Sequence, residues 1–233
     1  PGDAISVQRW PPSSLLGVQE LIEGVETAEG GRLVTLDDYI QYHGGQIAEA
    51  EVSECLRQFL VALDFAHSKG CIHRDLKPAN ILVAATEDEV IPKIADFGLV
   101  NAAGAEWMNT QVRSTVINPG EEDTLIDAGG TGSRSRALMG TYAFMSPEQK
   151  DGLPADARSD LYALGLMTFR MLTGLETPGL ERPSELGLGL DAGWDAWLIG
   201  TLKENPDDRF PTASAMQEAL DFRSAVSSVA VKP

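Results

Sequence analysis

One short stretch of the chain places a carboxylate, an ammonium group and a carboxamide between two apolar runs. Residues 71–83 read Cys-Ile-His-Arg-Asp-Leu-Lys-Pro-Ala-Asn-Ile-Leu-Val, so Lys77 follows Asp75 by two positions and Asn80 follows it by five. A carboxylate can accept a hydroxyl proton, an ammonium group can neutralise a phosphate oxygen, and an amide oxygen is a hard ligand for Mg²⁺. The stretch therefore indicates phosphoryl-transfer chemistry on a loop between two apolar elements.

The spacing of apolar residues predicts helices on both sides of this loop. Val52, Leu56, Phe59, Leu60 and Leu63 recur at helical intervals, which predicts a helix over 49–68 that ends at the Lys-Gly pair 69–70. Residues 159–172 are apolar nearly all round, which predicts a second, buried helix. Shorter helices are expected over 35–42, 195–204 and 213–226.

Strand and turn signals fill in the remaining organisation. Alternating residues predict two adjacent strands at 4–7 and 15–18, the second continuing to 20–24. A small hairpin is expected from 81–83 and 91–95 around the acidic turn 86–89. Polar, Gly-rich composition predicts loops at 25–32 and 176–190 and a long mobile loop over 101–136.

Composition limits the classes of partner and compartment. The net charge is −17 with a pI of about 4.4, which argues against nucleic acid or an anionic membrane as the main partner. The chain has two cysteines, which provide neither a disulfide framework nor metal-ligand spacing and favour a reduced, cytoplasmic setting. We find no apolar run long enough to cross a membrane. Because residue 1 is proline, we expect a piece of a longer polypeptide, whose membrane anchor, if it has one, would lie outside this chain.

Five motifs in order carry a resemblance to a known family. They are His73-Arg74-Asp75, Asp96-Phe97-Gly98, the segment 140–148 that ends in Ser-Pro-Glu, the segment 159–165 that begins Ser-Asp-Leu, and Asp207-Asp208-Arg209-Phe210. Together they resemble the protein kinase superfamily, specifically its bacterial eukaryotic-like Ser/Thr members. The resemblance implies an α+β, protein-kinase-like fold. Its large lobe would be mainly helical with a small β-hairpin, and its small lobe would be truncated to about two strands.

The resemblance also implies catalytic and cofactor roles. Asp75 would be the base that accepts the substrate hydroxyl proton, and Lys77 would contact the transferred phosphoryl group. Asn80 and Asp96 would bind the metal ion that ATP requires, with Mg²⁺ expected and Mn²⁺ as an alternative. Leu82 would lie beneath the adenine, and the backbone of a hinge containing Glu20 and Ile22 would bind its edge.

Further residues are expected to support these groups. Thr141 would hydrogen-bond Asp75 and Lys77, and Phe97 would pack against His73. Asp160 would bind the backbone of the catalytic loop. The remaining expected contacts are an ion pair between Glu148 and Arg209, and a phosphate of the activation loop bound by Arg74, with Thr131, Ser133 and Ser135 as candidate autophosphorylation sites in a dimer.

The sequence departs from the family in its first part. Residues 1–24 would be a remnant of the small lobe and hinge, and 25–233 would be the large lobe, with an activation segment over 96–148. The first lysine is Lys69, and no Gly-x-Gly-x-x-Gly motif precedes the catalytic loop. We therefore expect the isolated chain to bind ATP weakly and to transfer phosphate poorly.

Three functions fit the motifs. The favoured one is transfer of the ATP γ-phosphate to Ser or Thr hydroxyls of proteins. A truncated kinase-like scaffold without catalysis is the main alternative. A small-molecule phosphotransferase is disfavoured by Lys77 and the segment 140–148. The glycines at 187 and 189 superficially fit a dinucleotide fingerprint, but no strand precedes them, so we interpret that match as coincidence.

Overall fold

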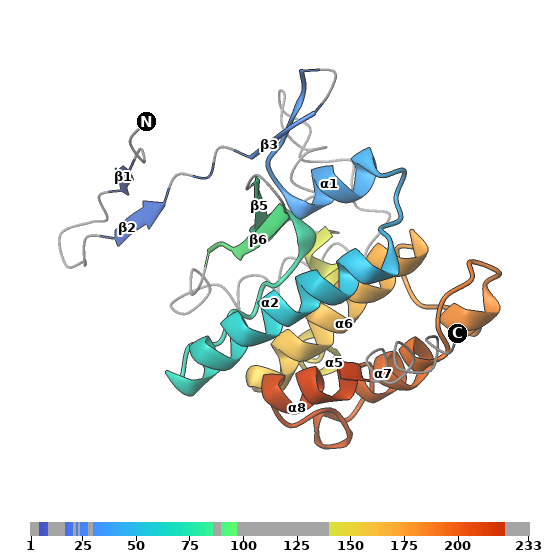
Figure 1. Cartoon of the computed structure of the whole chain (residues 1–233). Coiled ribbons are helices and arrows are strands. Elements are labelled where there is room, and N and C mark those ends of the chain that lie inside the picture. The colour runs from blue at the N-terminus through green and yellow to red at the C-terminus, as the bar shows by residue number, and fades with distance from the viewer. Residues whose placement is uncertain are drawn as a thin grey trace, which may run out of the picture.

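The computed structural model describes residues 5–8, 17–20, 22, 24–27, 30–85, 90–96 and 140–221. Helices dominate these residues, and two long helices lie side by side at the centre of the molecule (Figure 1). The predicted mobile loop 101–136 and Phe97 lie outside the described residues.

The strands in the described part of the chain form three two-stranded antiparallel sheets. The first pairs β1 (Ile5–Gln8) with β2 (Gly17–Glu20), so the two predicted strands are adjacent, but β2 ends at Glu20 instead of continuing to 24. The second pairs β3 (Val25–Glu26) with β4 (Arg32–Leu33). The third pairs β5 (Ile81–Ala85) with β6 (Val90–Ile94), which confirms the predicted hairpin.

The prediction of a simple loop over 25–32 is wrong, because its two ends pair as β3 and β4. Val25 lies opposite Leu33, and Thr27 N donates to Gly31 O at 2.9 Å. Gly30 has a φ of 81°, a conformation that glycine adopts at little cost. The Gly-rich composition indicated a turn correctly, but two flanking residues on each side were too few to show a strand pattern.

The first helices follow the predicted bounds. Helix α1 (Leu36–Tyr42) begins after Thr35, whose Oγ1 accepts a hydrogen bond from Asp38 N. Helix α2 (Glu49–Ser68) buries the predicted apolar face, and a 3₁₀ turn η1 (Pro78–Asn80) precedes β5.

Helix α6 (Ala157–Thr173) is buried on most of its surface and packs on α2. It begins two residues before the predicted start, because Asp156 caps its first turn by accepting from Arg158 N. It ends at Gly174 with a φ of 73°. Gly165 faces Thr201 so closely that a Cβ would collide with the threonine side chain.

Short elements complete the described fold. They are α5 (Pro147–Lys150), η2 (Pro183–Glu185), α7 (Gly193–Thr201), η3 (Pro206–Asp208), α8 (Ala213–Glu218) and η4 (Ala219–Asp221). Residues 140–144 are also helical.

Helices α7 and α8 differ from their predicted bounds. Helix α7 lies two residues earlier at its start than expected and ends before 204, and α8 gives way to η4, with 222–226 outside the described residues. Trp194 and Trp197 are buried, and Trp197 Nε1 donates to Met216 O, which joins α7 to α8.

Candidate active site

The catalytic loop leaves the end of α2 and brings the three predicted polar groups together. Lys77 Nζ donates to Asp75 Oδ2 at 2.9 Å and to Oδ1 at 3.1 Å. Asn80 Nδ2 donates to the Asp75 carbonyl at 2.8 Å and to Oδ2 at 3.0 Å. Both side chains therefore hold the Asp75 carboxylate in one orientation, and each is a donor to it.

Thr141 joins this cluster from the helical residues 140–144. Its Oγ1 accepts from Lys77 Nζ at 2.6 Å. The expected contact with Lys77 is present, whereas the expected direct bond to Asp75 is not found among the described residues. Thr141 thus reaches the carboxylate through the ammonium group. This bond places the start of the segment 140–148 against the catalytic loop.

Asp160 on α6 holds the backbone of the catalytic loop. Its Oδ2 accepts from His73 N at 2.9 Å, and its Oδ1 accepts from Arg74 N at 2.8 Å. The Asp160 residue is only 1% exposed, so these bonds are shielded from water. Arg74 has a φ of 66°, an unusual value for a residue with a side chain. The predicted contact therefore stabilises a strained backbone immediately before Asp75.

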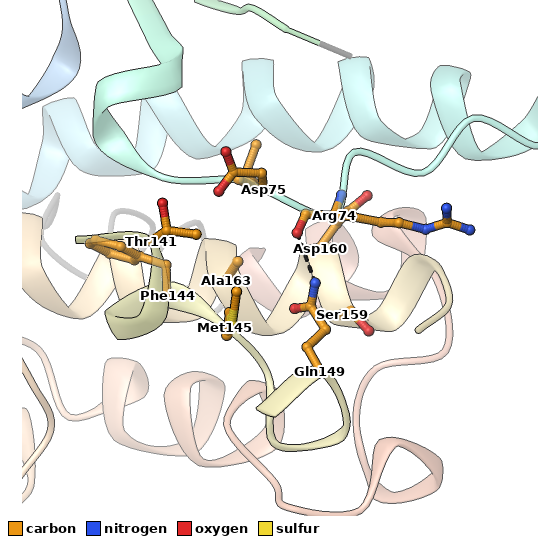
Figure 2. Close-up of a pocket in the computed structure, with 10 residues that line it drawn as sticks. Arg74, Asp75, Thr141, Phe144, Met145, Gln149, Ser159, Asp160 and Ala163 are labelled. Carbon is orange, nitrogen blue, oxygen red and sulfur yellow. Dashed lines mark hydrogen bonds between the residues drawn. The ribbon is translucent and has the colours of Figure 1, made fainter. Parts of the chain in front are cut away.

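The interpretation of the sequence missed two residues that support this loop, His67 through Asp160 and Gln149 directly. His67, in the last turn of α2, contacts Asp160 Oδ2 through Nε2 at 2.8 Å. Gln149 on α5 donates from Nε2 to the Arg74 carbonyl at 2.7 Å (Figure 2). His67 continues the apolar stripe of α2, at helical spacing after Leu63, and this position could have indicated that it faces inward. For Gln149, the pattern Ser-x-x-Gln indicates a capping box at a helix start but not the contact with Arg74.

Glu148 and Arg209 form the predicted ion pair. The two guanidinium nitrogens Nη1 and Nη2 donate to Glu148 Oε1 and Oε2 at 2.8 and 2.7 Å. Ser159 Oγ also donates to Oε1 at 2.6 Å. Burial alone would raise the pKa of Glu148, but the hydrogen bonds from Arg209 and Ser159 lower the pKa to about 2. Arg209 also donates to the carbonyls of Lys203 and Glu204, so the pair connects the end of the segment 140–148 to the loop before α8.

The residues expected at the metal lie next to each other. Ala95 N donates to the Asn80 carbonyl at 2.9 Å, which places Asp96 beside Asn80 at the end of β6. Asp96 is exposed and has a φ of 60°. Because Asn80 donates to Asp75 through Nδ2, its side-chain oxygen Oδ1 can serve as a metal ligand.

This donor set fits Mg²⁺. The described residues hold no group of three or more His, Cys, Asp or Glu side chains suited to a metal ion. Mg²⁺ is commonly bound by one or two protein oxygens together with water and substrate phosphates, which matches a carboxylate and an amide oxygen.

The other residues expected to contact the nucleotide lie on β5, on β2 and between β2 and β3. Leu82 lies half-buried on β5 and forms a bridge with Thr35. Glu20 is the last residue of β2, and Ile22 lies half-buried between β2 and β3. Phe97 lies outside the described residues, so its expected contact with His73 stays a prediction; His73 Nε2 is within 2.7 Å of the Ala95 carbonyl.

In Figure 2, side chains from several segments of the chain meet beside the catalytic loop. Asp75 and Arg74 come from the loop, Thr141, Phe144 and Met145 from 140–145, and Asp160 from α6. No space for a water molecule remains between them. The loop is therefore supported by a closely packed base.

Comparison with known proteins places this geometry in context. The family model of the protein kinase domain matches residues 18–184. The serine/threonine-protein kinase PknB of Mycobacterium tuberculosis is 32% identical over 203 residues, which cover 80% of this chain and 28% of that relative. A probable serine/threonine-protein kinase PknB of Bifidobacterium longum is 29% identical over 199 residues, covering 77% of this chain and 24% of the relative. The chain thus spans about a quarter of the length of these curated relatives.

Solved structures share the fold. The kinase domain of Mycobacterium tuberculosis PknI superposes with a TM-score of 0.57 at 21% identity, covering 88% of this chain and 65% of that chain. This similarity confirms the predicted kinase-like fold with a mainly helical large lobe and few strands. No helix in the described residues has the length and hydropathy needed to span a bilayer.

Proposed function

Because the chain belongs to the protein kinase family, we propose that it carries the catalytic loop of a Ser/Thr protein kinase, which transfers the ATP γ-phosphate to Ser or Thr hydroxyls of protein substrates. The names of the PknB relatives support the choice of Ser/Thr substrates. The observation that carries the proposal is the cluster of Asp75, Lys77, Asn80 and Thr141, held together by hydrogen bonds.

Each member of this cluster has a chemical task. The Asp75 carboxylate accepts the proton of the substrate hydroxyl as that oxygen attacks the γ-phosphorus. Lys77 neutralises negative charge that builds on the transferred phosphoryl group. Its bonds to Asp75 and Thr141 keep the ammonium group beside the carboxylate. Thr141 connects this pair to the segment that would receive the substrate peptide.

The cofactors are ATP and Mg²⁺, with Mn²⁺ as an alternative ion. Asp96 and the Asn80 side-chain oxygen would hold the metal. When bound, Mg²⁺ supplies charge neutralisation for the phosphates. Leu82 would contact the adenine, and the backbone at Glu20 and Ile22 would bind its edge.

We propose the same domain limits that the sequence indicates. Residues 1–24 are assigned to the end of the small lobe and the hinge, and 25–233 to the large lobe, with the activation segment over 96–148. The isolated chain is expected to bind ATP weakly, since no lysine precedes Lys69 to clamp the phosphates. The second candidate is a kinase-like scaffold that presents this lobe to a partner protein.

The setting and regulation are also part of the proposal. Cys55 and Cys71 are free, which suits the reducing cytoplasm where ATP is available. Dimerisation would allow autophosphorylation of the activation segment at Thr131, Ser133 or Ser135, all outside the described residues, and Arg74 would bind the phosphate.

The test uses the longest natural polypeptide that contains this chain. Phosphate transfer from labelled ATP to a Ser/Thr peptide library is measured for the wild type, for Asp75→Asn and for Asp151→Asn, an exposed aspartate on the same lobe. Loss of the general base lowers kcat by about 100-fold or more, whereas the control retains wild-type turnover. A wild type without transfer to any peptide would support the scaffold instead, and transfer to a sugar or antibiotic alone would support a small-molecule phosphotransferase.

A further inference from the structure

Gln149 connects the segment proposed to bind substrate to the catalytic loop. It lies in the first turn of α5, directly after the Glu148 of the ion pair. Its Oε1 accepts from both Ser146 N and Ser146 Oγ at 3.1 Å. Its Nε2 donates to the Arg74 carbonyl at 2.7 Å, the bond drawn in Figure 2. One side chain therefore spans the two segments, with its acceptor on one and its donor on the other.

The Arg74 carbonyl belongs to the peptide group that leads into Asp75. A peptide group is planar, so holding its oxygen also fixes the direction of the Asp75 N–H and limits rotation of the residue that follows. Asp160 holds the preceding peptide groups through the amides of His73 and Arg74. The amides are thus held from α6, and the carbonyl is held from α5.

We propose that Gln149 is a positioning residue for phosphoryl transfer: it sets the orientation of Asp75 relative to the segment 140–148, which it contacts at Ser146. The inference rests on the proposed kinase function. Arg74 is in the left-handed region, a conformation that is unfavourable for a residue with a side chain unless its surroundings stabilise it. The N–H of the Arg74–Asp75 peptide group donates to His73 Nδ1 at the longer distance of 3.3 Å. Loss of the Gln149 bond therefore loosens this peptide group at its carbonyl end, and the Asp75 carboxylate is held less firmly in its productive orientation.

The positioning role and the helix-capping role of Gln149 use different atoms, Nε2 for the first and Oε1 for the second, so they can be tested separately. A capping box at the third helical position is served equally by glutamate or glutamine, because only an acceptor oxygen is needed. Donation to a carbonyl oxygen needs an N–H group, which glutamate lacks when ionised. Gln149→Glu therefore keeps the cap on Ser146 but places a carboxylate against the Arg74 carbonyl.

The experiment compares Gln149→Glu and Gln149→Met with Gln217→Glu, an amide-to-acid control on α8. All are made in the longest natural polypeptide that contains this chain. Steady-state transfer to a Ser/Thr peptide gives kcat and KM for ATP, and thermal unfolding reports on folding. We expect both Gln149 variants to lower kcat about tenfold, as loss of one positioning hydrogen bond would, while KM for ATP stays within about twofold. Gln149→Met should lose the cap and unfold at a lower temperature, whereas Gln149→Glu keeps the cap and is destabilised only by repulsion between its carboxylate and the Arg74 carbonyl.

Hydrogen exchange of the peptide covering 71–77 supplies a readout that does not depend on turnover. Exchange there should be faster in Gln149→Glu than in the wild type and unchanged in Gln217→Glu. Wild-type kcat and exchange in Gln149→Glu would overturn the inference. If the wild type transfers no phosphate while exchange is faster in Gln149→Glu, the proposed function is refuted but the positioning contact stands.

Discussion

Replacing Glu148 by glutamine removes the charge that neutralises Arg209. The Arg209 side chain is 0% exposed and the Glu148 side chain 7% exposed, so water cannot take the place of the lost charge. Breaking a buried ion pair by removing one partner costs about 3 to 5 kcal/mol. Arg209 keeps its bonds to the carbonyls of Lys203 and Glu204. The glutamine oxygen can still accept one bond, so we expect about 3 kcal/mol, the lower end of this range.

The pKa of Glu148 gives an independent estimate of the same energy. A pKa of about 2 in the folded chain, against an ordinary value of 4.5, corresponds to about 3 kcal/mol of stability. Because the folded pKa is lowered, this contribution is complete above pH 4.5 and is lost as the pH falls toward 2. Glutamine does not titrate. The difference in unfolding free energy between wild type and Glu148→Gln should therefore shrink from about 3 kcal/mol at pH 6 to about 1 kcal/mol at pH 3.

Urea unfolding of the purified chain at the two pH values measures this difference. With a slope of about 3 kcal/mol per M, the midpoint of Glu148→Gln should fall by about 1 M at pH 6. Asp207→Asn is the matched control, because Asp207 pairs with Arg158 but its side chain is 80% exposed. Such a pair contributes about 1 kcal/mol or less. A Glu148→Gln effect no larger than this control at pH 6, or one that persists undiminished at pH 3, would refute the reasoning.

Three further predictions test other parts of the fold and site. Asp160→Asn should lower phosphate transfer by about tenfold or more, measured by kinetics with the peptide substrate. The asparagine side chain has one acceptor oxygen, so it cannot accept separately from the backbone N–H groups of His73 and Arg74. Gly165→Ala should destabilise the chain by about 1 to 3 kcal/mol through collision with Thr201, measured by urea unfolding. Thr35→Ala should cost about 1 kcal/mol by removing the cap of α1, with Thr35→Ser expected to restore most of it in the same assay.

Local patterns made much of the fold predictable. The five apolar residues of α2 repeat at helical spacing, and all of them are buried. The cap residue Thr35 and the hairpin β5–β6 were also visible, because capping and strand pairing across a short turn depend on neighbours in sequence. The error at β3–β4 arose where the strands are two residues long, too short for any period to appear.

The contacts of the candidate site were likewise predictable where the residues are close in sequence and harder to predict where they are far apart. Asp75, Lys77 and Asn80 lie within five residues of one another, so the spacing alone placed them on one loop. The pairing of Glu148 with Arg209 spans 61 residues and came from the resemblance rather than from any local signal. Gln149 reaches the loop across 75 residues of chain, and His67 contacts Asp160, which holds the loop, across 93 residues; both contacts were missed.

The sequence by itself determined which groups are available for the chemistry, because a carboxylate, an ammonium group and an amide on one tight loop must lie near one another. Only the tertiary structure decided how the loop that carries them is held. Asp160 on α6 and Gln149 on α5 bind the two sides of the Arg74 backbone (Figure 2). Hydrogen bonds to a backbone depend on where helices pack, and packing is set by the whole buried core rather than by neighbours along the chain.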